Sequence, residues 1–237
     1  MRLLERFVEN PRVCAYLPEQ LASLEVRVML DVTPEETEAL LEKGWRRFGP
    51  IYFHPACREC SECVSLRVVV GSFRPSKSQR RAERATAGLR QVVGVPRVDD
   101  ARLALYAKWH AEREAARGWE PNAQTRERYA LEFGFRHASA RELAFYDDAR
   151  GGRLVGVGLF DETPSAYSAA FFFYDPEYAR LSLGTANVLA MIDRAIGAGK
   201  RHLYLGYRVA GCESLSYKAT FRPHELLSRA GWQLAEP

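Results

Sequence analysis

The residues best suited to chemistry are gathered between Cys57 and Arg81. Cys57, Cys60 and Cys63 stand at two-residue spacing, so three soft thiolate ligands could share one metal ion or cluster. A run of basic residues follows, in which Glu83 is the one acid among Arg67, Arg74, Lys77, Arg80, Arg81, Arg84 and Arg90. A soft-ligand site beside an anion-binding site indicates a protein that handles nucleic acid or acidic substrates.

The cysteines favour a metal over disulfide bonds. The chain has five cysteines, an odd number, and no secretion signal, whereas the cytosol keeps thiols reduced. Cys14 with Cys57, Cys60 and Cys63 makes four soft ligands, suited to an iron–sulfur cluster or to tetrahedral zinc. We therefore predict a metal or cluster at these four residues, with buried or redox-active free thiols as the alternative.

The composition is that of an ordinary globular protein. The 237 residues are 47% hydrophobic and 27% charged, with a net charge of +4. The chain can therefore bury a stable core without disulfide bonds or structural metals. No segment approaches the roughly 18 unbroken apolar residues of a membrane span. Charges at Arg2, Glu5 and Arg6 also leave no room for a signal peptide. We expect a cytoplasmic protein with neither a membrane nor DNA as a partner.

The basic and cysteine segments must be positioned by the elements around them. Thr33 and Pro34 predict the start of a helix that ends at Gly44. Candidate strands at 51–53 and 66–70 flank the cysteine loop, and residues 76–91 are expected to form a basic helix. Gly94-Val95-Pro96 then breaks the chain. We place a domain boundary there, between a cysteine-containing α/β domain (1–95) and a second domain (96–237).

The second domain has an α+β order of elements. Its pattern predicts helices at 99–117 and 124–134, strands at 141–147, 153–160 and 166–174, a helix at 184–198, and strands at 202–207 and 216–221. This order resembles the acetyltransferase-like (GNAT) fold, whose cleft opens where a central strand leads into a helix N-terminus. Here Ser182, Leu183, Gly184 and Thr185 begin that helix, so their backbone N–H groups could meet an anion or oxyanion.

Four motifs together resemble a known family. They are Cys14-Ala15-Tyr16-Leu17-Pro18, the loop of Cys57, Cys60 and Cys63, Phe73 to Arg81, and a C-terminal set of Phe173 to Pro176, Ser182 to Thr185, Tyr204 to Tyr207 and Tyr217 to Pro223. In order and spacing they resemble the aminoacyl-tRNA protein transferases of the N-degron pathway, especially the bacterial aspartate/glutamate leucyltransferase branch. Leu17 stands where the eukaryotic arginyltransferases have a second cysteine, which favours leucine as the transferred residue.

The resemblance implies an enzyme with two macromolecular partners. The α-amino group of a protein beginning with Asp or Glu attacks the ester of leucyl-tRNA, and the product is marked for degradation. The transfer itself requires no cofactor, because the ester is already activated. An α-amino pKa of about 7.7 to 8.0 leaves a useful neutral fraction near pH 7. The protein is then expected to position the substrates and stabilise an oxyanion.

The same motifs supply candidate site residues. Arg74, Lys77, Arg80 and Arg81 would bind the acceptor carboxylate and tRNA phosphates, with Ser78 and Gln79 as neutral partners. Asp175 would accept a proton or hold an ammonium group, and Lys218 would contact a phosphate or carbonyl. Tyr204, Tyr207 and Tyr217 would stack on the terminal adenosine or orient the ester. Asp175, Tyr207 and Lys218 are the catalytic candidates, and Tyr174 and Gly206 complete the substrate-binding set.

Each assignment has a structural alternative. The basic segment could be a solvated helix face, and the tyrosines could fill a core with their hydroxyls satisfied. Asp175 could cap the turn before Pro176, and Lys218 could be an edge-strand charge. For the whole chain, the alternatives are an arginyltransferase, a non-catalytic tRNA-binding module and an acyl-coenzyme A N-acyltransferase. The missing Gly-rich phosphate loop disfavours the last of these.

Overall fold

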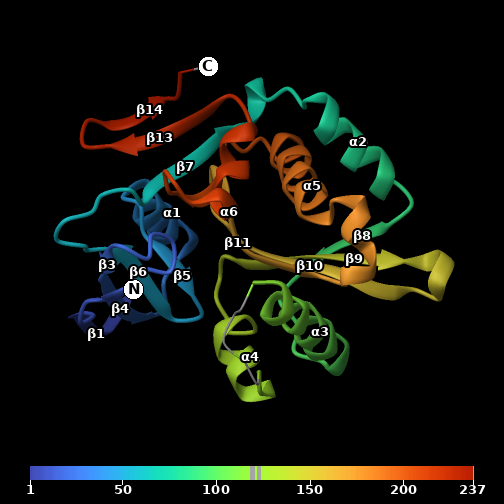
Figure 1. Ribbon diagram of the computed structural model, residues 1–237, viewed down its shortest axis with the longest axis horizontal. Coiled ribbons are helices and arrows are strands. Elements are labelled where there is room, and N and C mark those ends of the chain that lie inside the picture. The colour runs from blue at the N-terminus through green and yellow to red at the C-terminus, as the bar shows by residue number, and fades with distance from the viewer. Residues whose placement is uncertain (118–120, 122–123, 237) are drawn as a thin grey trace.

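Two large sheets, a short ribbon and the helices around them make up the described part of the protein. The computed structural model describes residues 1–117, 121 and 124–236 (Figure 1). Among these residues the strands form a four-stranded sheet, an eight-stranded sheet and a two-stranded ribbon. The ribbon joins β2 (Arg12–Val13) to β3 (Leu21–Ala22).

The four-stranded sheet is antiparallel and lies near the N-terminus. Its order is β1 (Arg2–Val8), β4 (Leu24–Leu30), β6 (Ile51–Pro55) and β5 (Arg46–Phe48). Helix α1 (Pro34–Glu42) begins as the sequence predicts, because Thr33 and Glu36 form a reciprocal capping box ahead of Pro34. Helix α1 and this sheet share a small core that includes Met29, Leu40 and Tyr52.

The eight-stranded sheet is the larger scaffold. Its order is β14 (Gly231–Leu234), β13 (His224–Ser228), β7 (Val64–Val69), β12 (His202–Arg208), β11 (Ala166–Tyr174), β10 (Arg153–Glu162), β9 (Ala140–Asp147) and β8 (Arg90–Gly94). Every neighbouring pair in it is antiparallel except β11 and β12, which are parallel. The parallel pair places the helix between these strands on one face of the sheet.

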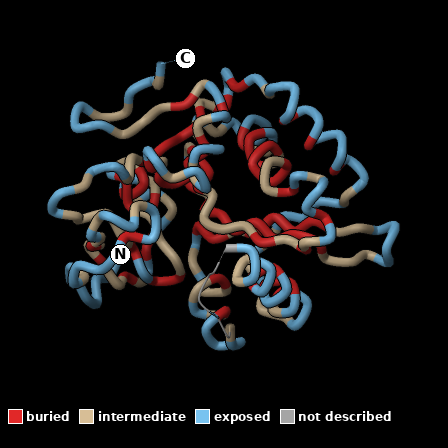
Figure 2. Tube along the Cα trace, in the orientation of Figure 1, coloured by how far each residue is buried: buried red, intermediate tan, exposed pale blue. Residues whose placement is uncertain are grey.

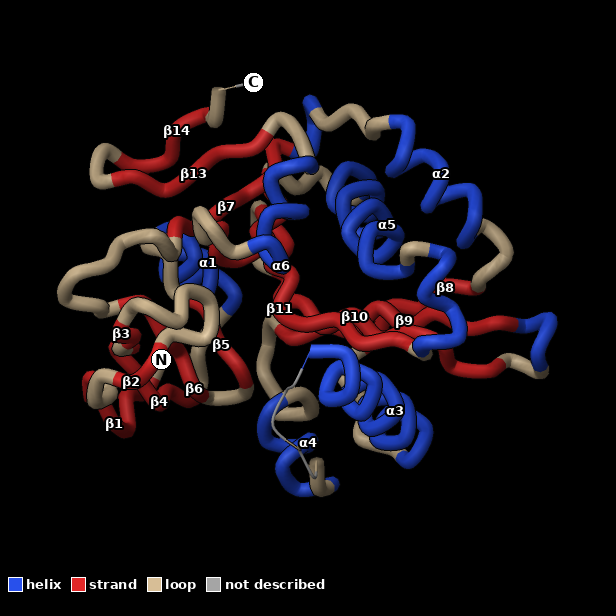
Figure 3. Tube along the Cα trace, viewed as in Figure 1, coloured by secondary structure: helices blue, strands red, loops and turns tan. Residues whose placement is uncertain are grey.

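Helices cover both faces of the large sheet (Figures 1 and 3). On one face lie α5 (Leu183–Gly197) and, packed against it, α2 (Lys77–Thr86); on the other lie α3 (Asp100–Arg117) and α4 (Arg126–Glu132). One hydrophobic core fills the space under α5 and a second, rich in aromatic rings, the space under α3 and α4. Buried residues follow the sheet and the inner side of α5 (Figure 2). No helix of the described chain is long and apolar enough to cross a membrane.

The α+β order of elements expected from the sequence is confirmed. The helices and strands expected between residues 99 and 207 are present within a few residues of their predicted ends. The prediction of a strand at 216–221 is wrong. Ser216 ends helix α6 (Glu213–Ser216), and Tyr217–Thr220 forms a 3-10 helix, which we call the 217–220 turn. The hairpin of β13 and β14 was not expected.

The change from one sheet to the other falls inside the cysteine loop, between β6 and β7. Strands β7 and β8, which precede the division predicted at 95/96, both pair with strands that follow it. They bring the basic helix α2 with them, so that α2 packs on α5 rather than on the N-terminal sheet. The two sheets meet where β5 contacts β11, and the candidate site lies at this contact.

Candidate active site

A pocket opens where the two parallel strands separate. β11 and β12 pair over three positions, Ala166 with His202 to Ser168 with Tyr204, although both strands continue beyond them. The pocket has a volume of about 120 Å³ and is lined by Tyr16, Arg46, Arg47, Phe48, Phe53, Ala170, Leu205, Gly206, Tyr207 and Lys218. It therefore combines residues from the N-terminal sheet, from both separating strands and from the 217–220 turn.

Arg46 enters this pocket from β5 of the other sheet. Its guanidinium donates to Ser168 Oγ at 2.8 Å and also to the carbonyl oxygen of Ala169. Ala169 is the first residue of β11 beyond its pairing with β12. A backbone carbonyl that has lost its strand partner needs another donor, and Arg46 supplies it. Burial lowers the pKa of Arg46, because a charge is less stable away from water.

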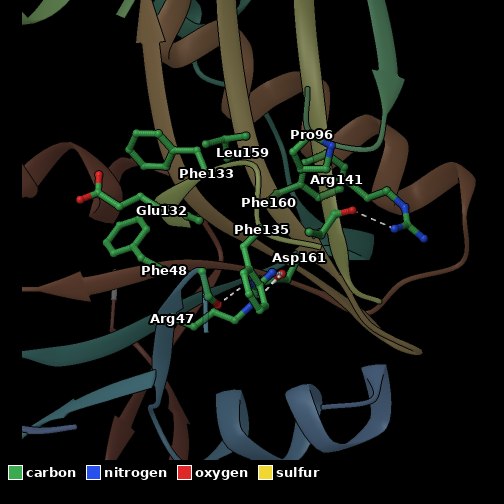
Figure 4. Close-up of a pocket in the computed structure, with 13 residues that line it drawn as sticks. Arg47, Phe48, Pro96, Glu132, Phe133, Phe135, Arg141, Leu159, Phe160 and Asp161 are labelled. Atoms are coloured by element: carbon green, nitrogen blue, oxygen red, sulfur yellow. Dashed lines mark hydrogen bonds and ion pairs between the residues drawn. The ribbon is translucent and has the colours of Figure 1, made fainter. Parts of the chain in front are cut away.

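The neighbouring Arg47 also borders the pocket, but its guanidinium anchors β5 to the large sheet. It donates to the carboxylate of Asp161 on β10 and, at 2.9 Å, to the carbonyl of Gly49 (Figure 4). The side chains of this ion pair are less than a tenth exposed. Successive side chains of a strand point to opposite faces, so fixing Arg47 against Asp161 also fixes the direction of Arg46.

Lys218 reaches the same pocket from the 217–220 turn. Its Nζ donates to the carbonyl oxygen of Tyr207 on β12 at 2.7 Å, and the residue is 9% exposed. Burial, followed by the charge of Arg46, lowers the pKa of Lys218 to about 7. Near neutral pH this amine is therefore close to half protonated, which suits a group that must take up a proton and release it again.

Gly206 lets β12 pass close to Arg46. Its φ of +80° lies in the left-handed region that favours glycine. The register between β12 and β7 also shifts between Tyr204 and Gly206, as at a bulge that redirects a strand. A Cβ on Gly206 would lie 3.5 Å from Cζ, Nε and Nη2 of Arg46. The predicted importance of Gly206 thus has a physical reason in the shape of this wall.

The three candidate tyrosines have different surroundings. Tyr204 is buried outside the pocket, where its hydroxyl donates to Glu42 at 2.8 Å and accepts from Arg67, so it cannot stack on a nucleotide. Tyr207 lines the pocket, but its hydroxyl donates to the carbonyl of Gly44 at 2.9 Å, and burial raises its pKa. Tyr217 is exposed and stays available for stacking.

Asp175 is a structural residue in this fold. It is 2% exposed, accepts from the backbone N–H of Glu177, and pairs with Lys108 at 2.8 Å and with Arg153. The carboxylate is therefore neutralised inside the protein, and the prediction that it accepts a proton from substrate is corrected in favour of the capping alternative. The hydroxyl of Tyr174, at the end of β11, accepts from Arg113 at 3.0 Å.

The basic segment forms the exposed face of α2. Arg74, Lys77, Ser78, Arg80 and Arg81 are exposed and have no ion-pair partner among the described residues. Gln79 instead points inward: it is 3% exposed, completes a capping box with Ser76 and donates to the carbonyl of Thr220 at 3.2 Å. Gln79 is thus corrected from a substrate contact to a link between α2 and the 217–220 turn.

The start of α5 is partly suited to the anion binding that was predicted for its backbone N–H groups. Ser182 is exposed with a left-handed φ of 55° and makes no capping hydrogen bond with its side chain. Gly184 and Thr185 follow it in the first turn, where backbone N–H groups lack helical partners. The side chain of Leu183 is 1% exposed in the core, so of this residue only the backbone is open to a ligand.

The four candidate metal ligands line one cavity next to the pocket. Cys14, Cys57, Cys60 and Cys63 contribute to a space of about 490 Å³ that shares Tyr16, Phe53 and Tyr207 with the pocket between the strands. Burial and then the neighbouring thiols raise the pKa of Cys63 to about 12. The donor chemistry suits a soft metal, yet no three cysteines, histidines or acids of the described chain are grouped closely enough to hold one. As arranged here, the thiols do not form a metal site.

Sequence reasoning missed Arg46, Tyr16 and Phe53 as pocket residues. Tyr16 was present only as part of a family motif, and Arg46 carried no motif at all. One signal was available: the pair Arg46-Arg47 lies on a three-residue strand, whose alternation directs one of the two cations inward. The partner that each arginine meets is set by long-range packing, which no local pattern contains.

Comparison with family models shows that the protein is a transferase. Two family models match the chain: "Arginine-tRNA-protein transferase, N terminus" over residues 12–81 and "Arginine-tRNA-protein transferase, C terminus" over residues 101–228. The chain therefore belongs to the arginine-tRNA-protein transferase family, as its motifs predicted.

Curated relatives extend this family likeness over nearly the whole chain. An aspartate/glutamate leucyltransferase of Halorhodospira halophila is 36% identical over 94% of this chain and 94% of the relative. One of Campylobacter jejuni is 34% identical over 90% of this chain and 89% of the relative. A solved structure of FemX is similar over 83% of this chain and 67% of its own, with 9% identity and a TM-score of 0.49.

Proposed function

We propose that the protein transfers leucine from leucyl-tRNA to the α-amino group of proteins that begin with Asp or Glu. Family membership and the names of the relatives support this reaction. The observation that carries it is the pocket between β11 and β12, where Lys218 and Arg46 face a small space between separated strands. The product would be marked for degradation through the N-degron pathway, and we place the reaction in the cytoplasm.

The chemistry needs positioning and a proton acceptor. The amine nitrogen attacks the ester carbonyl, a C–N bond forms, and the bond to the 3′-terminal ribose oxygen breaks. The proton lost by the amine passes to the neutral form of Lys218, and the departing ribose oxygen takes up a proton to leave as a hydroxyl. A pKa of about 7 allows Lys218 to accept and then return that proton.

The cavity beside the pocket supports leucine as the donor residue. Its lining is largely apolar and includes Leu17, Leu24, Phe53 and Val64. Among the described residues that line it, none is Asp or Glu. A leucyl side chain would lose water favourably there, whereas an arginyl guanidinium would be buried without a counter-charge. This favours leucyl over arginyl transfer.

The exposed face of α2 is suited to tRNA. Lys77, Arg80, Arg81 and Arg84 repeat at the spacing of one helix face. The first turn of α2 is tied to the 217–220 turn by Gln79, so phosphates bound on α2 would lie near the pocket. We therefore assign the backbone of tRNA, rather than the acceptor carboxylate, to this helix.

A metal is not needed for this reaction, and no step above depends on one. An iron–sulfur cluster or zinc at Cys14, Cys57, Cys60 and Cys63 remains a separate proposal, which requires the cysteine loop to close further than in this structure. Elemental analysis of anaerobically purified protein tests it. Stoichiometric iron or zinc would support the site, and the absence of both would overturn it.

Transfer assays test the function directly. Purified protein would be incubated with labelled leucyl-tRNA or arginyl-tRNA and with peptides that begin with Asp, Glu or Ala. We expect leucine to be incorporated into the acidic acceptors alone. Arginine incorporation would overturn the choice of donor, and salt-sensitive tRNA binding without transfer would favour a non-catalytic tRNA-binding protein.

A further inference from the structure

The pocket between β11 and β12 contains positive charge that the protein does not balance. Arg46 and Lys218 both donate to backbone carbonyls, and neither has a carboxylate within ion-pair distance among the described residues. The adjacent Arg47, by contrast, is paired with Asp161. Partly buried cations without a counter-charge are costly, and an anionic ligand would remove that cost. The arrangement is therefore suited to an anion.

The size and shape of the pocket limit which anion can enter. Its volume is about 120 Å³, and aromatic and aliphatic side chains such as Phe48, Phe53 and Leu205 form much of its wall. A carboxylate on a short side chain fits such a space. A phosphodiester carries a sugar on each side and does not. The open helix α2 is better suited to that larger group.

Arg46 also keeps donors free for a ligand. Nη1 and Nη2 each use one hydrogen, on Ser168 and Ala169 respectively, whereas a guanidinium has five N–H hydrogens in all. Gly206 lies over the guanidinium of Arg46, since a Cβ there would be 3.5 Å from Cζ, Nε and Nη2 alike. The missing side chain leaves this side of the guanidinium uncovered, and two neighbouring N–H donors of an arginine are the geometry that binds a carboxylate at both oxygens.

We propose that Arg46 binds the side-chain carboxylate of the acceptor's N-terminal Asp or Glu and so selects acidic N-termini. This inference rests on the proposed leucyl transfer. The selected carboxylate and the attacking amine belong to one amino acid. The protein groups that bind them must therefore be no farther apart in space than the length of one amino-acid residue. Arg46 and Lys218 meet this requirement, because they line the same small pocket, one from β5 and the other from the 217–220 turn.

The test compares acceptors that differ only in charge. Peptides beginning with Asp, Asn, Glu or Gln are presented with labelled leucyl-tRNA to the wild type and to Arg46→Gln, and kcat/KM is measured for each. Loss of a buried charged partner costs on the order of 10²-fold. We expect Arg46→Gln to reduce transfer to Asp and Glu by about that factor, with a small change for Asn and Gln. The preference for acidic over amide acceptors should nearly vanish.

Two further variants keep the test decisive. Arg90→Gln removes an exposed arginine that pairs with Asp148 away from the pocket, and it should leave the preference unchanged. Arg46→Lys retains a charge and a donor for Ala169 but loses the planar fork, so it should give an intermediate preference. It also serves as the test variant if thermal unfolding shows that Arg46→Gln does not fold.

The outcomes separate this inference from the reaction on which it rests. A preference that Arg46→Gln leaves unchanged would overturn the inference. Equal losses for Asp and Asn acceptors, together with weaker leucyl-tRNA binding, would also overturn it and assign Arg46 to a tRNA phosphate. If the wild type itself transfers no leucine to any acceptor, the proposed function fails.

Discussion

The exposed helix α2 and the pocket between β11 and β12 both carry cations without acidic partners among the described residues, yet they are suited to different tasks. Lys77, Arg80 and Arg81 lie in water, where salt screens their field and many phosphates could satisfy them. Arg46 and Lys218 are held in fixed positions by carbonyls of the two separating strands. Exposure suits attraction of a large polyanion, whereas burial suits discrimination between a charged and a neutral small group.

The largest effect is expected on stability, when the buried ion pair between Arg47 and Asp161 is broken. Arg47→Met leaves the carboxylate of Asp161 buried without its partner, which should lower the free energy of unfolding by about 3 to 5 kcal/mol. Urea denaturation measures this loss. Arg90→Met, which breaks an exposed pair with Asp148, should cost no more than about 1 kcal/mol. Equal costs for the two variants would contradict the anchoring role of Arg47.

The next effect is on proton transfer. Lys218→Met should lower kcat/KM for leucyl transfer on the order of 10²-fold near pH 7. In the wild type, the rate should rise as the pH passes about 7, where Lys218 loses its proton. That step should be missing from the variant, in which only the titration of the acceptor amine remains. Lys218→Arg is the matched control, since it can still donate to Tyr207 but stays charged; activity close to wild type there would exclude a proton-accepting role.

The same lysine should make stability depend on pH. Its pKa is about 7 in the folded protein against 10.5 for an ordinary lysine, so between these values the unfolded chain binds more protons. The contribution of Lys218 to stability therefore rises with pH from about 7 to 10.5 and is least favourable below 7. We expect Lys218→Met to raise Tm relative to the wild type more at pH 6 than at pH 9. A difference in Tm independent of pH would contradict the shifted pKa.

A smaller effect is expected at the wall of the pocket. Gly206→Ala forces a non-glycine residue into φ of +80° and places a methyl group against Arg46. The strain should cost about 1 to 2 kcal/mol of stability, and the methyl should reduce transfer to acidic acceptors. Gly151→Ala, at φ of +70° on the surface with nothing within 4 Å of the new Cβ, is a control with similar strain. If both variants lose equal activity, the loss in Gly206→Ala does not come from contact between the new methyl group and Arg46.

The smallest effect per residue is expected on α2. Replacing Lys77, Arg80 or Arg81 singly by Gln should weaken leucyl-tRNA binding only a few-fold and reduce the salt dependence of binding by about one ion per residue. Stability and the preference for Asp over Asn should stay unchanged, because these side chains are exposed and lie outside the pocket. Filter binding over a range of salt concentrations measures the slope. A changed acceptor preference would mean that α2 also contacts the acceptor.

Much of the fold could be predicted because its signals are local. Thr33 and Pro34 mark the start of α1, and the apolar patterns of β9, β10, β11 and α5 identify these elements without tertiary information. The 217–220 turn was mistaken for a strand because its aromatic and threonine residues suit a strand in isolation. In the folded protein, Lys218 instead donates a hydrogen bond to the carbonyl of Tyr207.

The site was only partly predictable because its residues come from distant segments. Lys218 and Tyr207 were named from a motif and do line the pocket. Asp175 and Gln79 were named for the same reason, but internal ion pairs and hydrogen bonds already engage them. Arg46 could not be separated from Arg47 by sequence, since their roles differ only through Ala169 and Asp161, which lie more than a hundred positions further along the chain.

The origin of the pocket in two distant segments has a consequence during translation. Arg46 leaves the ribosome long before Lys218, which lies more than 170 positions later in the chain. Helix α2, with its exposed cations, is synthesised long before β11 and β12 can enclose the gap. A nascent or prematurely terminated chain could therefore attract tRNA but would lack the complete pocket. The order of synthesis thus withholds the reactive centre until β11, β12 and the 217–220 turn have all been made.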